Sequence, residues 1–232
     1  MARREATFTD DLAASLSAWS TAPELPLLTV ALAAAADLSY VIGPAGTVIA
    51  LPALVVLAGF AGTQRIWYLR VFRGRTLEHS LVWPMTWAFV GRYLALGFLF
   101  GIPFALVVLP IFLAVSGTAS RALVTVPVVF VADFIGTFVT SALAFSTHHV
   151  TKAMSIGWRT LWDGWPATAP YALVAPLVVI GLGQTLGRTI GGPGAFAVEL
   201  LGTLLTLLCK GATTAYYLRT HSVGDYGAAL AE

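Results

Sequence analysis

Long apolar blocks of about twenty residues alternate along this chain with short polar segments. A hydrocarbon core of ~30 Å needs about 20 helical residues at ~1.5 Å each, and blocks without alternating polarity favour helices over a barrel. The pattern predicts an all-α integral membrane protein, a single domain over residues 1–232. Its six transmembrane helices are expected near 25–42, 46–68, 88–116, 121–148, 168–187 and 195–218.

Three shorter stretches with apolar residues at helical spacing precede pairs of these helices. They are 8–20, 154–165 and a weaker copy at 76–87 that Pro84 interrupts. Amphipathic helices of this kind lie in the headgroup plane of a membrane. The order indicates three degenerate repeats of an interfacial helix plus a hairpin, near 8–70, 76–149 and 150–219.

Composition and charge place the chain in a membrane and orient it. Hydrophobic residues make up 58% and charged residues 10%, whereas soluble domains carry about 25% charged residues. Of the 13 Lys and Arg residues, all but Arg121 and Arg188 fall at the chain ends or in the second and fourth links. This bias predicts that both termini face the cytoplasm, in the cytoplasmic membrane of a bacterium, with the turns at 43–46 and 191–194 outside. The charges are spread along the chain, so no nucleic-acid partner is expected.

All seven tryptophans fall on the same predicted cytoplasmic boundary, where indole rings are enriched. They are Trp19, Trp67, Trp83, Trp87, Trp158, Trp162 and Trp165. We interpret them as lipid-interface anchors. The alternative is an aromatic site for a lipid headgroup or a quinone-like molecule.

Two segments resemble a known family. The run Ser141–Ser146, the motif Trp158-Arg159-Thr160-Leu161-Trp162 with the Pro-bearing apolar helix after it, and the closing Thr213–Arg219 are similar to uncharacterised bacterial six-helix membrane proteins. That group includes the membrane domain of glycerophosphoryl diester phosphodiesterases. The resemblance implies a membrane-embedded accessory domain. Because no phosphodiesterase domain is attached, it does not imply that activity.

A polar stripe follows the last predicted helix. Its members recur every three or four residues and therefore share one face: Glu199, Thr203, Thr206, Lys210, Thr213 and Tyr217. The fourth helix has a shorter row of Asp133, Thr137 and Ser141. Hydroxyls at such positions form interhelical bonds worth ~0.6 kcal/mol each. A stripe of this length is expected to face protein or water instead of lipid.

Four ionisable residues are predicted within the membrane: Asp37, Asp133, Glu199 and Lys210. Each costs at least ~2.5 kcal/mol near the bilayer centre unless it is paired. They indicate either a polar pathway for a proton, ion or small solute between helices four and six, or structural ion pairs that fix helix packing. Asp133 and Lys210 lie at similar depth, so we expect them to pair or to share a polar cavity; Lys210 could instead extend toward the cytoplasmic boundary.

The sequence shows no catalytic pattern, and we expect no cofactor. Cys209 is the single cysteine, and the adjacent His148 and His149 point ~100° apart on a helix, so no metal site is expected. These features favour a non-enzymatic protein that contacts the bilayer and other membrane subunits, as a transporter component or an assembly factor. The alternatives are a small autonomous channel or carrier and, less favoured, an intramembrane enzyme acting on lipid.

Overall fold

The computed structural model describes residues 6–38, 42–114, 118–182, 190, 192–221 and 223, and within them it is entirely helical. The helices are Phe8–Thr21 (α1), Glu24–Ala36 (α2), the short 3-10 helix Gly43–Gly46 (η1), Thr47–Phe72 (α4), His79–Ala114 (α5), Thr118–Phe145 (α6), Val150–Asp163 (α7), Ala169–Ile180 (α8) and Gly192–Thr220 (α10). Helices α4, α5, α6 and α10 each contain a stretch long and apolar enough to cross a membrane. The all-α class is thus confirmed for the described residues, and the four long apolar helices are compatible with a membrane-embedded protein.

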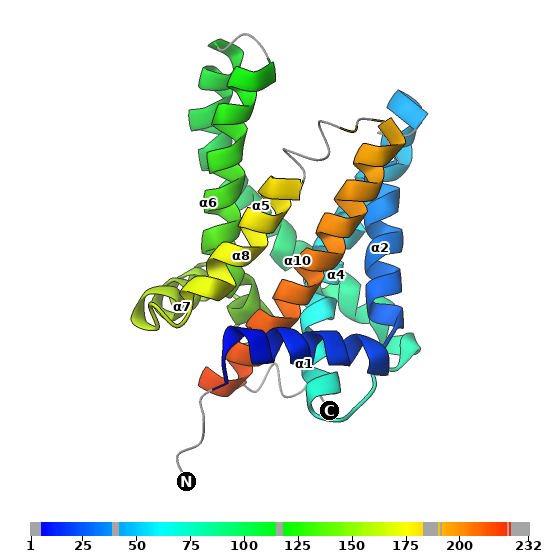
Figure 1. Cartoon of the computed structure of the whole chain (residues 1–232), viewed down its shortest axis with the longest axis vertical. Coiled ribbons are helices and arrows are strands. Elements are labelled where there is room, and N and C mark those ends of the chain that lie inside the picture. Colours follow the sequence, from blue (N-terminus) through cyan, green and yellow to red (C-terminus); the bar gives the residue numbers. More distant parts are fainter. Residues whose placement is uncertain are drawn as a thin grey trace.

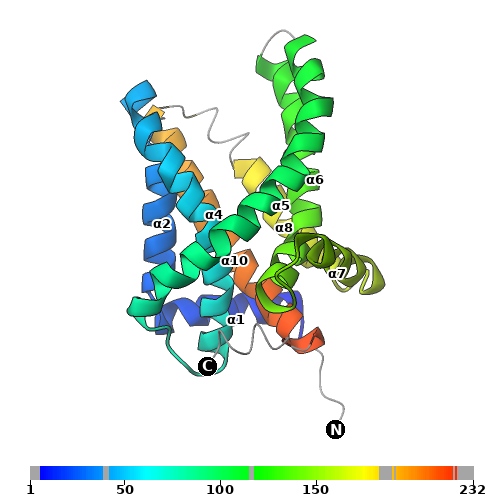
Figure 2. The ribbon, with the colours of Figure 1, turned by 180° about the vertical axis from the view of Figure 1, so that it is seen from behind.

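The long helices run up and down between two ends of the molecule, while α1 and α7 lie across one of these ends (Figure 1). The start of α1 and the end of α10 lie at that same end. Seen from behind, α5 crosses the molecule obliquely from the base of α4 to the upper part of α6 (Figure 2). Helices α1 and α7 correspond to the predicted amphipathic segments 8–20 and 154–165. Helix α1 ends one residue later than predicted, whereas α7 begins four residues earlier and ends two residues earlier.

Two of the six predicted membrane helices are shorter than expected. Helix α2 has 13 residues and α8 has 12, about 20 Å and 18 Å at ~1.5 Å per residue. The predicted segments 25–42 and 168–187 extend past them into 39–41 and 183–189, which lie outside the described residues. Both short helices are apolar. The described chain therefore has four long apolar helices and two short ones.

The sequence predicted a short amphipathic helix at 76–87 and a separate membrane helix at 88–116. This prediction was wrong. Helix α5 runs without a break through 36 residues and contains Pro84, Pro103 and Pro110. Proline is tolerated in membrane helices because neighbouring groups satisfy the freed carbonyls. A straight helix of this length would extend about 54 Å, longer than a ~30 Å hydrocarbon core. Its oblique course in Figure 2 fits that length.

Glycines let the two surface helices approach the long ones closely. A Cβ at Gly157 of α7 would lie 2.5 Å from the backbone nitrogen of Val139 in α6, and one at Gly211 of α10 would lie 2.0 Å from the Ser15 hydroxyl oxygen in α1. Neither position has room for a larger residue. Helices α1 and α7 are therefore packed onto the bundle by contact at van der Waals distance.

The tryptophans do not all face outward. Five are at least 43% exposed: Trp83, Trp87, Trp158, Trp162 and Trp165. Trp19 is half-buried, and its indole nitrogen donates to the Tyr68 hydroxyl at 2.7 Å. Trp67 is only 2% exposed, so its assignment to the lipid interface was wrong. It lies in the segment Phe60–Leu69 of α4, in which every residue except the half-buried Ala61 is buried. The depth of a residue along the membrane, which the sequence indicates, does not reveal which face of the helix packs inward.

Candidate functional site

A cavity of about 280 Å³ lies between α4, α5, α6, α8 and α10. Its polar lining includes three charged side chains: Arg65 of α4, Asp133 of α6 and Lys210 of α10. Hydroxyl groups of Tyr93, Thr137, Thr140, Thr206 and Thr213 add to it. The remaining wall is apolar and includes Leu96, Phe100, Ala175 and Val179. Two cations and one carboxylate thus face a small space with one polar and one apolar side.

Arg65 ties α4 to α6 and α10. One guanidinium nitrogen donates to the Ser141 hydroxyl at 2.7 Å and, more weakly, to Thr214 at 3.4 Å. The other donates to the Thr140 hydroxyl and to the Thr137 carbonyl, the latter at 3.4 Å. Arg65 is 3% exposed. Sequence reasoning counted it among the cytoplasmic positive charges and missed its buried role.

Lys210 lies at one end of a hydrogen-bonded chain that joins α10, α4 and α2. Its ammonium donates to the Gln64 carboxamide oxygen at 3.3 Å, the Gln64 amide donates to the Thr29 hydroxyl at 3.0 Å, and Thr29 donates to the Leu25 carbonyl at 2.7 Å. An ammonium has three N–H donors, and among the described residues Gln64 accepts the single hydrogen bond found for it. Lys210 therefore retains donors for another group in the cavity.

Asp133 and Lys210 share the cavity but do not form an ion pair. Within the part of the chain that the structure describes, the ion pairs shorter than 4.0 Å are Arg219–Asp11 and His79–Glu24. The Thr137 hydroxyl donates to the Asp133 backbone carbonyl at 2.8 Å, not to its carboxylate. Of the two arrangements that the sequence predicted, an ion pair or a shared polar cavity, the structure has the shared cavity, and the Lys210 ammonium binds Gln64.

A second cavity of about 230 Å³ continues along α10. Glu199, Thr203, Thr206 and Lys210 line it, and Thr206 and Lys210 also line the first cavity. Glu199 is close enough to Asp37, in the turn after α2, for their carboxylates to interact electrostatically. Five members of the predicted α10 stripe, Thr213 included, therefore face one of two adjoining cavities.

Besides Asp37, two predicted polar residues line neither cavity. The Tyr217 hydroxyl bonds the Ser146 hydroxyl at 2.7 Å, and the Tyr217 side chain is 1% exposed. Ser141 lines neither cavity but accepts from Arg65. Both residues contribute to helix packing, so the stripe changes role near the end of α10.

A buried cluster at the end of the molecule where α1 begins and α10 ends was missed. The Asp11 carboxylate of α1 accepts hydrogen bonds from both terminal guanidinium nitrogens of Arg219, which lies at the end of α10. It also accepts a hydrogen bond of 2.5 Å from the Tyr171 hydroxyl of α8. Asp11 is 2% exposed. Helical spacing placed Asp11 in the first turn of α1 but could not indicate that this face meets α8 and α10.

Within the described residues, no three His, Cys, Asp or Glu side chains are grouped as metal ligands. The rings of His148 and His149 lie 4.0 Å apart between centroids, near the start of α7. No family model, curated protein or solved structure matches this chain. The functional argument therefore rests on the chain's own geometry.

Proposed function

We propose that the chain crosses the cytoplasmic membrane six times, with both termini in the cytoplasm. Helices α2 and α8 would supply the two additional spans, helped by the segments that follow them. Three observations support this: the alternating direction of the six apolar helices in Figure 1, the shared end for the first and last helices, and the concentration of Lys and Arg in the links at that end.

Within this topology we propose that the protein is a non-enzymatic transporter component that binds a small organic anion in the cavity between α4, α6 and α10. The observation behind the proposal is the Lys210 ammonium, which faces a cavity with Arg65 nearby and Asp133 as the single carboxylate among its described lining residues. A charge buried within a membrane is costly and is retained mostly where it has a function. The apolar wall suits a solute with a nonpolar body.

A carrier that works without partners is the second candidate. It is favoured by the two adjoining cavities, which share Thr206 and Lys210 in their linings, so that polar side chains line one or the other along α10 as far as Glu199. A solute bound at Lys210 would need such a route to leave toward the other side of the membrane. The resemblance to six-helix accessory membrane domains favours the first candidate, in which other subunits complete the route.

The test uses the full-length chain, purified in detergent, and benzoate and acetate as probes. Benzoate combines a carboxylate with an apolar ring, so it should bind more tightly than acetate. Lys210→Met should lower benzoate affinity on the order of tenfold, since hydrogen bonds to charged groups contribute roughly 1.5–3 kcal/mol. Lys152→Met, on the exposed face of α7, is the matched control and should bind as the wild type does.

Proteoliposomes then separate the two candidates. Benzoate uptake by vesicles that contain this chain alone would favour the autonomous carrier. Binding without uptake would favour a component that needs partner subunits. If wild type binds neither probe, or if Lys210→Met binds as tightly as Lys152→Met while both remain folded, the anion site is wrong.

A further inference from the structure

Arg159 of α7 stands between two cavities on the surface of the molecule. It is exposed, and no hydrogen bond or ion pair to it occurs within the described residues. A guanidinium presents five donors in a planar fork that matches phosphate oxygens. An arginine fixed on a helix beside two hollows, with its donors uncommitted, is therefore positioned to bind an anionic group.

Most residues that line the cavity on one side of Arg159 have polar side chains. This cavity measures about 360 Å³ and lies between α7 and the end of α10. The Thr160, Thr220 and Asp163 side chains and the His221 imidazole line it. The His221 Nε2 and the Thr160 hydroxyl lie 3.0 Å apart, which holds the two helices together at this point. The Thr160 and Thr220 hydroxyls donate to the Ile156 and Tyr216 carbonyls, so Arg159 is the group that can receive a phosphate here. The Asp163 carboxylate can accept from hydroxyl groups of the same ligand.

The cavity on the other side is mostly apolar. It measures about 290 Å³ and lies between α6 and α7. Ile135, Val139, Met154 and the Trp158 ring form its apolar wall, and Ser155 completes it with Arg159. Its chemistry suits a hydrocarbon chain. The two hollows thus offer a polar and an apolar compartment that meet at one arginine.

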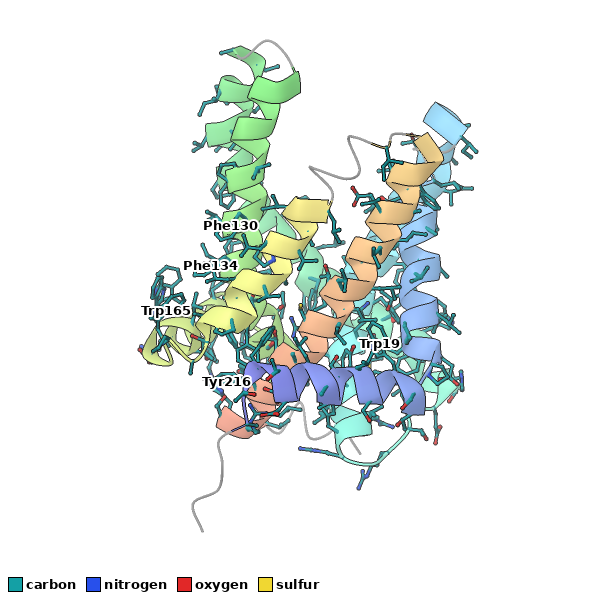
Figure 3. The ribbon with its side chains drawn as sticks, viewed as in Figure 1. Trp19, Phe130, Phe134, Trp165 and Tyr216 are labelled. Carbon is teal, nitrogen blue, oxygen red and sulfur yellow. The ribbon has the colours of Figure 1, made fainter. Side chains whose placement is uncertain are left out.

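The tryptophans around this site place it at the edge of the bilayer. Trp158, Trp162 and Trp165 are 43–48% exposed, and indole rings favour the boundary between headgroups and acyl chains. Figure 3 shows Trp165 beside Phe134 where α7 meets α6, with their ring centroids 6.4 Å apart, and Tyr216 near the end of α10. A phospholipid has a polar headgroup, then a phosphate, then apolar acyl chains. The cavity between α7 and α10, Arg159 and the cavity between α6 and α7 have the same order of chemistry.

We propose that Arg159 binds the phosphate of an anionic phospholipid with a hydroxyl-bearing headgroup. The headgroup lies in the cavity between α7 and α10, and the first part of an acyl chain lies in the groove between α6 and α7. This site is separate from the cavity at Lys210 and does not depend on an anion binding there. Its ligand is a structural or regulatory lipid held at the membrane surface.

Calorimetric titration of the full-length chain in detergent tests the proposal. The probes are phosphatidylglycerol and phosphatidylcholine with the same short acyl chains, and glycerol 3-phosphate as the headgroup alone. Both lipids offer a phosphate to Arg159, but only phosphatidylcholine brings a trimethylammonium cation close to the guanidinium, so wild type should prefer phosphatidylglycerol on the order of tenfold. Arg159→Gln should remove that preference. Lys152→Gln, on the same helix and exposed but outside both cavities, should keep it.

A second variant tests the apolar compartment. Ser155→Trp would fill the groove from an exposed position and should weaken phosphatidylglycerol binding severalfold. The proposal is overturned if Arg159→Gln keeps the preference, or if Lys152→Gln loses it equally, which would indicate general surface charge. It is also overturned if glycerol 3-phosphate binds as tightly as the lipid or if Ser155→Trp has no effect, since each would show that no acyl chain is bound.

Discussion

Replacing Asp11 by asparagine should loosen α1 from the rest of the protein. The carboxylate accepts two hydrogen bonds from Arg219 and one from Tyr171, and it is 2% exposed. Asparagine has almost the same volume and keeps one acceptor oxygen, so the substitution removes mainly the charge and one of the two acceptors. Any change should therefore come from the ion pair and not from packing.

The expected magnitude follows from the contacts. Hydrogen bonds to charged groups contribute roughly 1.5–3 kcal/mol each, but the Arg219 side chain is 39% exposed, so solvent screening reduces its share. A net loss of about 2 kcal/mol remains, which corresponds to about a 30-fold rise in local opening. Amide hydrogen exchange of α1, measured by mass spectrometry, should accelerate by that factor, because exchange reports local unfolding.

The neighbouring Asp10 supplies the control. It is exposed, lies in the same turn and takes part in the capping box with Thr7, so Asp10→Asn makes the same charge change without the ion pair. Its effect should stay below about 1 kcal/mol. Asp11→Asn and Arg219→Gln should be non-additive, as residues in contact are. Equal effects of the two aspartate variants, or strict additivity with Arg219→Gln, would refute the reasoning.

Three further outcomes are expected. In a Cys209→Ser background, cysteine at Ala45 should be labelled from outside and cysteine at Ala231 from inside; labelling of both from one side would contradict the six-span topology. Gly157→Ala should displace α7 from Val139 and raise its hydrogen exchange, whereas the same change at Gly136, where an added Cβ meets nothing within 4 Å, should not. Burial lowers the pKa of His221 below its ordinary value, so its protonation is disfavoured in the folded state; thermal stability should fall as pH drops below ~6.5, and His221→Gln should remove that part of the pH dependence.

The sequence was sufficient for the helical class, for the place of most helices and for the α10 face. Long apolar blocks indicate that the surrounding solvent is lipid. A period of three to four residues indicates which side chains share a helix face, so Thr203, Thr206 and Lys210 were grouped correctly. Where each stripe meets its neighbours depends on tertiary packing. That is why Gln64, which lies within a predicted membrane helix, was not recognised as the partner of Lys210.

Arg65 shows the limit of charge counting. Its position near the end of an apolar block fits a positive residue at the membrane surface, and the positive-inside rule treats every such residue alike. Whether the side chain extends outward or inward depends on acceptors from other helices. Here Ser141, Thr140 and Thr214 supply those acceptors. Three hydroxyls on two other helices give no signal in the sequence around residue 65.

The contact between Asp11 and Arg219 joins residues 208 positions apart, and this separation has a consequence for synthesis. A ribosome that adds ~5–20 residues per second makes Arg219 about 10–40 s after Asp11. During that interval α1 has left the ribosome while its cationic partner does not yet exist. The Asp11–Arg219 pair thus forms in one of the last steps of assembly. In a chain truncated before α10 this end of α1 would lack its cationic partner, and its backbone would be more open to a protease that removes incomplete products.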